Sequence, residues 1–111
     1  MSAGTYNFTI EQGTTFRRVL TLQENGAAMN LTGYSVASQM RSTHDSGSIV
    51  ATFTGTVSNA ATGQITLSMT NTTTSGIDEA LYVYDIEITS AGGDVTRILQ
   101  GTVTVTPEVT R

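Results

Sequence analysis

The sequence predicts an all-β domain, arranged as an antiparallel sandwich of about seven strands, and three observations support this prediction. Apolar and polar residues alternate in short segments, which is the period of a half-buried strand. Turn residues such as Asn-Gly and Gly-Gly separate these segments. Threonine, a β-branched residue that favours pleated sheets, accounts for 22 of the 111 residues. A barrel with a similar number of strands is the alternative.

The alternation also gives the positions of the strands and of the core. We expect strands at residues 6–10, 16–22, 35–41, 49–57, 65–69, 82–88 and 96–106. Their apolar, inward-facing positions predict a core that contains Phe8, Ile10, Leu20, Leu22, Val36, Phe53, Ile65, Leu67, Ile86 and Ile88. In the last segment the apolar positions change phase, which predicts a β-bulge at Gly101. Pro107 then ends the pairing.

The connections between these segments carry their own signals. Asn25-Gly26 predicts a tight turn, because both residues tolerate positive φ. Residues 42–48 are polar and predict a loop. Residues 71–79 break the two-residue period, and we expect a loop there with at most one short helical turn, capped by Asp78.

Length and composition bound the domain organisation and exclude several classes of function. A chain of 111 residues has the size of one domain, so we expect a single domain over 1–111, with a short N-terminal arm (1–5) and a C-terminal tail (107–111). The absence of cysteine excludes a disulfide framework and thiolate zinc ligands. A net charge of -4 argues against a nucleic-acid partner and against a polybasic membrane-surface protein. With no signal-peptide pattern and no spanning apolar run, we expect synthesis in a cytoplasm and no membrane partner.

The sequence predicts a protein without catalytic, cofactor-binding or metal-binding residues. His44 and Asp45 lie in one polar loop with several serines, where nothing fixes the geometry that a nucleophile and its base require. The nine carboxylates do not cluster with the spacing of metal ligands. We therefore expect no enzyme, no metal and no cofactor.

One segment, Asp78-Glu79-Ala80-Leu81-Tyr82-Val83-Tyr84, resembles the start of strand F in immunoglobulin-type domains. There, a tyrosine follows an aspartate by four residues and its hydroxyl bonds to backbone upstream, the tyrosine corner. In this chain Tyr82 would be the corner, and Tyr84 would stand where antibody domains place a cysteine. The alternative is that both are ordinary strand residues. This pattern refines the predicted fold to an immunoglobulin-like antiparallel β-sandwich.

The basic doublet Arg17-Arg18 is a candidate contact with another subunit. Adjacent residues on a strand point to opposite faces, and Arg18 shares the apparent core face. A charge there is costly unless it is paired or reaches solvent at an exposed strand end. Arg18 is therefore either a strand-end arginine reaching solvent or half of an ion pair with a neighbouring subunit. The candidate interface residues are Arg17, Arg18, Pro107, Glu108 and Arg111.

Four segments together resemble a family of small proteins encoded in the structural gene clusters of tailed bacteriophages. They also resemble the N-terminal domain of phage baseplate upper proteins. The segments are Tyr6-Asn7-Phe8-Thr9-Ile10-Glu11-Gln12-Gly13, Asn30-Leu31-Thr32-Gly33-Tyr34 followed by Met40-Arg41, Tyr82-Val83-Tyr84-Asp85-Ile86-Glu87, and the ending from Leu99 to Arg111.

The resemblance implies an immunoglobulin-like, non-enzymatic structural protein of the virion, made in the bacterial host cytoplasm. Baseplate or tail-fibre attachment is the first expectation and capsid decoration the second. The implied partners are other virion proteins, with this chain a homo-oligomer in the particle. Baseplate proteins continue into receptor-binding domains where this chain ends, which favours an adaptor. A host-carbohydrate module, with Tyr34, Tyr82 and Tyr84 as stacking platforms, is a further alternative.

Overall fold

The computed structural model describes residues 4–24, 26–43 and 47–108, and over these ranges the chain is almost entirely strand and turn. One helix, α1 (Asn71–Ser75), interrupts the strands. The strands are β1 (Gly4–Thr5), β2 (Phe8–Glu11), β3 (Phe16–Thr21), β4 (Gln23–Glu24), β5 (Ala27–Ala28), β6 (Ser35–Arg41), β7 (Ala51–Asn59), β8 (Gln64–Met69), β9 (Ala80–Thr89) and β10 (Val95–Thr106). The predicted all-β class is confirmed.

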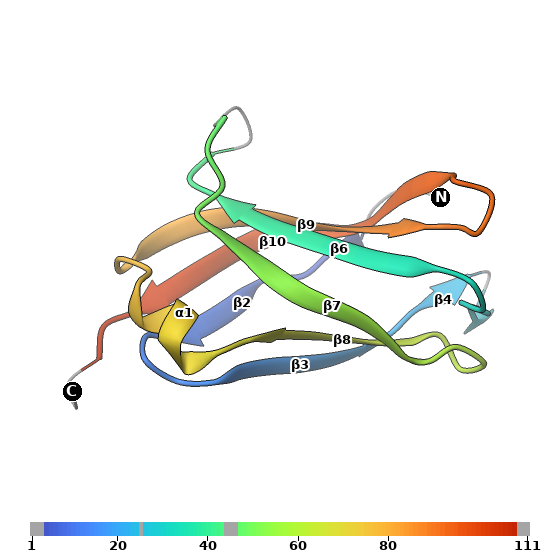
Figure 1. Ribbon diagram of the computed structural model, residues 1–111, viewed down its shortest axis with the longest axis horizontal. Helices are drawn as coiled ribbons and strands as arrows, with labels where there is room; N and C mark the ends of the chain where they lie inside the picture. Colours follow the sequence, from blue (N-terminus) through green and yellow to red (C-terminus); the bar gives the residue numbers. More distant parts are fainter. Residues whose placement is uncertain (1–3, 25, 44–46, 109–111) are drawn as a thin grey trace.

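All but two of these strands form one curled sheet that is open along one side (Figure 1). Its order is β1-β10-β9-β6-β7-β8-β3, and β2 pairs with β10 farther along the same edge as β1. Both β1 and β2 run parallel to β10, whereas the other pairs are antiparallel. The remaining strands, β4 and β5, make a separate small hairpin around the predicted turn that contains Gly26.

The curl arises at β7, which changes its partner after the first third of its length. Its first three residues, 51–53, pair with β6, and from Thr54 onward it pairs with β8. Figure 1 shows β7 crossing from the group of β6, β9 and β10 to the group of β8 and β3. Gly55 lies just after the change, where a Cβ atom would come within 2.8 Å of Val36 Cγ1. The two halves of the sheet therefore face each other across one interior.

The interior is filled by the apolar side chains that the alternation selects. Eight of the ten predicted core residues are buried. The two exceptions, Leu20 and Val36, are half-buried, because Leu20 faces the open side of the sheet and Val36 lies where β6 has no β7 neighbour. The buried apolar residues that the core prediction omitted are Phe16, Leu31, Met40, Ala51, Met69, Ile77, Tyr82, Tyr84, Ile98, Val103 and Val105.

The predicted tyrosine corner is present. The Tyr82 hydroxyl donates a 2.6 Å hydrogen bond to the backbone carbonyl of Asp78, four residues upstream. Tyr84, two residues later, is also buried, and its hydroxyl donates to the backbone carbonyl of Tyr6. Both hydroxyls thus join the start of β9 to other parts of the chain, which satisfies polar groups that burial would otherwise leave unpaired.

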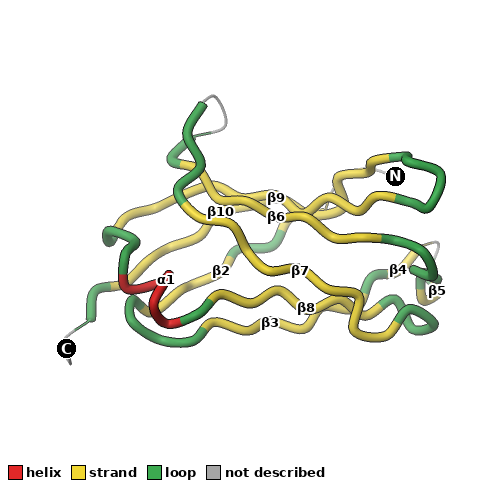
Figure 2. The backbone as a smooth tube through the Cα atoms, viewed as in Figure 1, coloured by secondary structure: helices red, strands yellow, loops and turns green. Residues whose placement is uncertain are grey.

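The turn that leads to this corner differs in one detail from the prediction. The expected helical turn is α1, but its N-cap is Thr70, whose side chain accepts a 3.3 Å hydrogen bond from the backbone nitrogen of Thr73. Asp78 follows the helix, so its predicted capping role is wrong. Threonine is a good N-cap in its own right, and the helix begins directly after β8. Figure 2 shows α1 at the same end of the molecule as the C-terminal tail.

The predicted β-bulge exists but lies earlier in β10 than Gly101. The register between β10 and β9 shifts between Arg97 and Leu99, and Gly101 is in register with Tyr84. The extra residue allows Ile98 to be buried while its neighbour Leu99 also packs against the core. Gly101 has a different role, because a Cβ atom there would overlap the Tyr6 carbonyl oxygen.

The two buried tyrosines predict a loss of stability at alkaline pH. Burial, and to a lesser degree the charge of Asp78, raises the pKa of Tyr82 above its ordinary value of 10.0. Burial, with a smaller contribution from Tyr6, raises the pKa of Tyr84 even further. Above pH 10 the unfolded chain therefore releases protons that the folded chain retains, so the free energy of unfolding falls as pH rises.

The chain has no lysine, so few other groups titrate between pH 9 and 11. Urea unfolding across this range is expected to show a decline above pH 10 that is shallower in the Tyr84→Phe variant. The same slope in both proteins would contradict this assignment.

Candidate functional site

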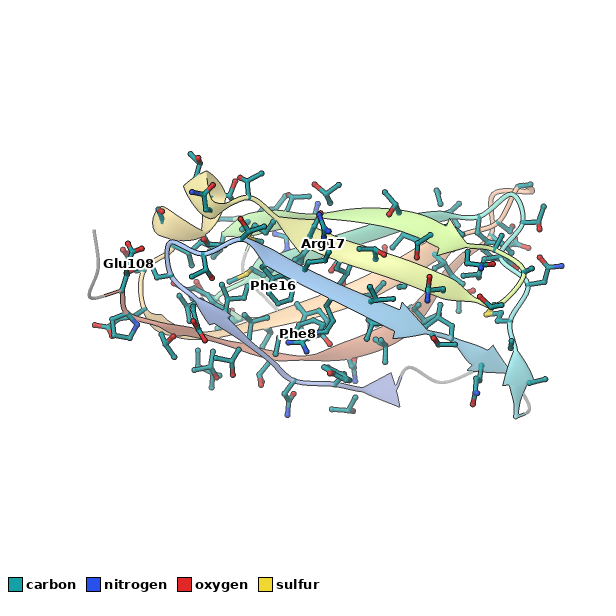
Figure 3. All side chains as sticks on the ribbon, turned by 90° about the horizontal axis from the view of Figure 1, so that it is seen from below. Phe8, Phe16, Arg17 and Glu108 are labelled. Atoms are coloured by element: carbon teal, nitrogen blue, oxygen red, sulfur yellow. The ribbon has the colours of Figure 1, made fainter. Side chains whose placement is uncertain are left out.

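The open side of the sheet lies between β2 and β3, and we call this opening the seam. The paired neighbour of β2 is β10, and that of β3 is β8; in the described ranges no strand pairs connect β2 to β3. Figure 3 shows the two strands diverging from the turn that joins them, so that the seam widens away from this turn. Unpaired strand edges of this kind are natural sites for contact with another protein.

The backbone of β3 has free hydrogen-bonding groups along the seam. Leu22, directly after β3, donates a 2.8 Å hydrogen bond to the carbonyl of Gly63, which marks these two residues as a hydrogen-bonded pair. Such pairs alternate along an antiparallel ladder, so the even-numbered residues of β3 bond to β8. The amide and carbonyl groups of Arg17, Val19 and Thr21 therefore point away from β8, and no described residue bonds to them.

Arg18 lies on the inner face of β3, beside two aromatic rings. Its guanidinium carbon is 5.6 Å from the ring centroid of Phe8 on β2 and 5.7 Å from that of Phe16 on β3. Figure 3 shows these two rings next to each other in the seam. Cation–π contacts account for this position. The predicted opposite orientation of the doublet is confirmed, because Arg17 is exposed and Arg18 half-buried.

The Nε atom of Arg18 is buried and has no hydrogen-bond partner among the described residues. Arg18 also lies in the middle of β3, so it is not the strand-end arginine of the first interpretation. A buried donor without an acceptor carries a desolvation cost that an incoming carboxylate or carbonyl oxygen would remove.

The wide part of the seam contains an apolar depression of about 410 Å³. It separates β1 and the first half of β10 from the end of β3 and the residues that follow it. Its lining residues are Gly4, Tyr6, Leu20, Thr21, Leu22, Gln23, Met29, Ile98 and Leu99. A depression of this size accommodates one or two apolar side chains of a partner.

At the narrow end of the seam, the start of the C-terminal tail contacts the turn between β2 and β3. The Glu108 amide donates a 3.1 Å hydrogen bond to Gln12 Oε1, and Gln12 Nε2 donates a 2.8 Å bond to the carbonyl of Ile77. The predicted interface residue Glu108 is thus held by its own chain, while Pro107 is exposed. Arg111 lies outside the described residues. Nothing in the local pattern around Gln12 indicated this contact, because its partners are 65 and 96 residues away.

A second depression, of about 440 Å³, lies on the outer face of β6, β9 and β10 and is polar. Its charges are mixed, and Arg97 Nε lies 3.3 Å from Asp85 Oδ2. Across residues 4–24, 26–43 and 47–108, no three histidine, aspartate or glutamate side chains form a group that could hold a metal ion. His44 and Asp45 lie outside the described residues. Of the three tyrosines considered for sugar stacking, Tyr82 and Tyr84 are buried and Tyr34 is half-buried.

Replacing Arg18 with leucine is expected to raise the free energy of unfolding of the isolated chain by about 1 kcal/mol. The change removes a buried donor without a partner and places an apolar side chain beside Phe8 and Phe16. Urea unfolding measures the effect, and Arg17→Leu, on the exposed face of the same strand, is the matched control with little expected change. A loss of stability in Arg18→Leu would mean that the cation–π contacts outweigh the missing hydrogen bond.

Comparison with known proteins gives no family assignment for this chain. No protein-family model matches the sequence, and no curated protein matches it significantly. Within the described parts of the chain, no helix has the length and apolar character needed to span a membrane. The seam, with its free strand edge, Arg18 and its apolar depression, is therefore the candidate functional site on geometric grounds.

Proposed function

We propose that the chain is an immunoglobulin-like sandwich whose two layers meet at β7. The order β3-β8-β7 corresponds to strands B, E and D of a constant-type immunoglobulin domain, and β6-β9-β10 to strands C, F and G. The tyrosine corner at Tyr82 lies at the start of the strand that corresponds to F, where this fold family places it. The pairing and the corner together support this fold over a closed barrel.

The function that the site supports best is a non-enzymatic structural part that acts through protein–protein contacts. The observation that carries this proposal is the seam, where a strand edge with unbonded backbone groups lies beside an apolar depression and beside the half-buried Arg18, whose buried Nε atom has no acceptor among the described residues. Contact with another polypeptide would bond the free backbone groups, cover the apolar depression and give the Arg18 Nε atom an acceptor.

The sequence resemblance to phage structural proteins suggests where these contacts occur. We place the chain in the virion of a tailed bacteriophage, as a baseplate or tail-fibre adaptor that is made in the host cytoplasm. Its partners are other virion proteins and further copies of itself. Decoration of the capsid is the alternative role, since the free edge of β3 could bind a capsid protein as well as a tail protein.

Quantitative mass spectrometry of purified particles tests this proposal. The chain is expected at a fixed copy number per particle, and separated tails are expected to retain it while separated capsids lack it. Retention by the capsids alone would select the decoration role. Absence of the chain from intact particles would contradict the proposal.

A further inference from the structure

We propose that the seam is a strand-acceptor site, which an extended segment of another protein fills by pairing with the free edge of β3. The segment places an acidic side chain against Arg18 and an apolar side chain in the depression beside Leu20. The identity of the donor as a virion protein and the comparison with strand A of immunoglobulin domains rest on the proposed function, whereas the chemistry of the site does not.

The first argument is that a strand position beside β3 is vacant. In constant-type immunoglobulin domains the sheet runs in the order A-B-E-D, so that strand A covers the edge of strand B. In this chain β3, β8 and the part of β7 from Thr54 onward correspond to B, E and D. The first strands, β1 and β2, pair instead with β10. No described strand occupies the place of strand A beside β3.

The second argument is that the vacant position offers a row of hydrogen-bonding groups. The amides and carbonyls of Arg17, Val19 and Thr21 point into it, as the alternation of bonds to β8 requires. An added strand bonds to all three residues, which is the usual source of affinity when a peptide extends a sheet. The side chain of Val19, in the middle of this row, is 51% exposed and lies on the outer face of β3.

The third argument concerns the side chains that such a strand must carry. Directly opposed residues of neighbouring strands lie on the same face, so the residue opposite Arg18 points into the seam with it. A charge on the inner face of an edge strand opposes indiscriminate strand addition, because most added strands would bury it unpaired. A carboxylate instead forms a charge-assisted hydrogen bond with the unpartnered Nε of Arg18. Arg18 is therefore a selector for acidic segments.

The neighbouring inner position sets the second requirement. The residue opposite Leu20 lies two positions from the one opposite Arg18 and points into the apolar depression. The donor segment thus carries an aspartate or glutamate and a large apolar residue, separated by one residue. Charge complementarity and apolar burial together define the pattern acid-x-apolar, read in either direction according to the orientation of the added strand.

A displayed library of random peptides of about nine residues, long enough to pair along all of β3, is the probe. Selection on the full chain is expected to enrich peptides with the acid-x-apolar pattern. When a selected peptide is bound, hydrogen exchange measured by NMR is expected to slow at the amides of Arg17, Val19 and Thr21. No enriched binder, or binders that leave these three amides unprotected, would overturn the proposal.

Three variants separate the parts of the proposal. Val19→Pro removes an amide that faces the seam without removing a bond to β8, and proline is tolerated at such edge positions. It is expected to weaken peptide binding about tenfold or more. Val19→Ala, which keeps the amide, is the matched control and should bind within about twofold of the parent chain. Arg18→Leu is expected to keep the edge and to lose the preference for aspartate over asparagine in the peptide.

The outcomes distinguish this site from the proposed function. Edge-binding peptides together with absence from particles would retain the acceptor site and reject the virion role. If the chain is present in particles but no peptide binds the edge of β3, the virion role would be retained and the acceptor site rejected. A dimer of the chain that forms without peptide and is abolished by Val19→Pro would assign the vacant position to a second copy, and would overturn the proposal of a separate donor.

Discussion

Replacing Ile86 with alanine is expected to lower the free energy of unfolding by about 2–5 kcal/mol. Ile86 is fully buried, at the middle of β9, the strand that lies between β10 and β6. It faces Leu99 on one side and Ser38 on the other, and Ser38 is itself buried with its hydroxyl bonded to the carbonyl of Asp85. The truncation leaves a cavity in a close-packed core, where little relaxation can fill it.

The same strand provides the control for this prediction. Leu81 lies on β9 with 63% of its surface exposed, and Leu81→Ala is expected to change the free energy of unfolding by less than about 0.5 kcal/mol. Urea unfolding of both variants, followed by circular dichroism, measures the difference. If Ile86→Ala cost only a few tenths of a kcal/mol, then the assignment of inner and outer faces along β9 would be wrong.

The longer strands were predictable because each is marked by the alternation of apolar and polar side chains within its own segment. Tyr82, Tyr84, Ile86 and Ile88 alternate with polar neighbours, and β9 buries all four of them. The tyrosine corner was predictable for the same reason, since the hydroxyl of Tyr82 reaches a carbonyl only four residues away. Local periodicity therefore identified seven of the ten described strands, most of their inner faces and one defining hydrogen bond, whereas the two-residue strands β1, β4 and β5 were not predicted.

Features that depend on distant partners could not be predicted in this way. The bulge in β10 lies between Arg97 and Leu99, and Gly101 instead lies beside Tyr6, which is 95 positions earlier in the sequence. The surroundings of Arg18 depend on whether the first strand joins β3 or β10, and the alternation is identical in the two arrangements. The seam is a property of strand pairing, and hence it became visible only in the fold.

The seam thus exists because β1 and β2 pair with β10 and not with β3. Three contacts hold the link between β1 and β2 against β10 and its neighbour β9. The Tyr6 amide donates to the carbonyl of Gln100, the Thr102 amide donates to Asn7 Oδ1, and the Tyr84 hydroxyl donates to the Tyr6 carbonyl. All three converge on Gly101, whose missing side chain lets the Tyr6 backbone approach. We therefore expect that the glycine keeps β1 and β2 on β10 and away from β3.

Replacing Gly101 with alanine is accordingly expected to lower the free energy of unfolding by about 2–5 kcal/mol, the sum of overpacking and a lost hydrogen bond. The new Cβ atom would overlap the Tyr6 carbonyl oxygen and lie 2.7 Å from Asn7 Oδ1. The obstructing atom is backbone, so the link must move and the buried Tyr84 hydroxyl loses its acceptor. Gly92→Ala is the matched control with little expected effect, since the nearest atom to its Cβ is Ser90 Oγ at 3.8 Å.

A double-mutant cycle with Tyr84→Phe tests this mechanism. In the parent chain Tyr84→Phe is expected to cost about 1–2 kcal/mol, because the Tyr6 carbonyl loses its donor. In the Gly101→Ala background the bond is already broken, so the same change should cost much less, and the two effects should not add. Additive costs would show that the first strand stays on β10 when Gly101 is replaced, and that this glycine does not direct its path.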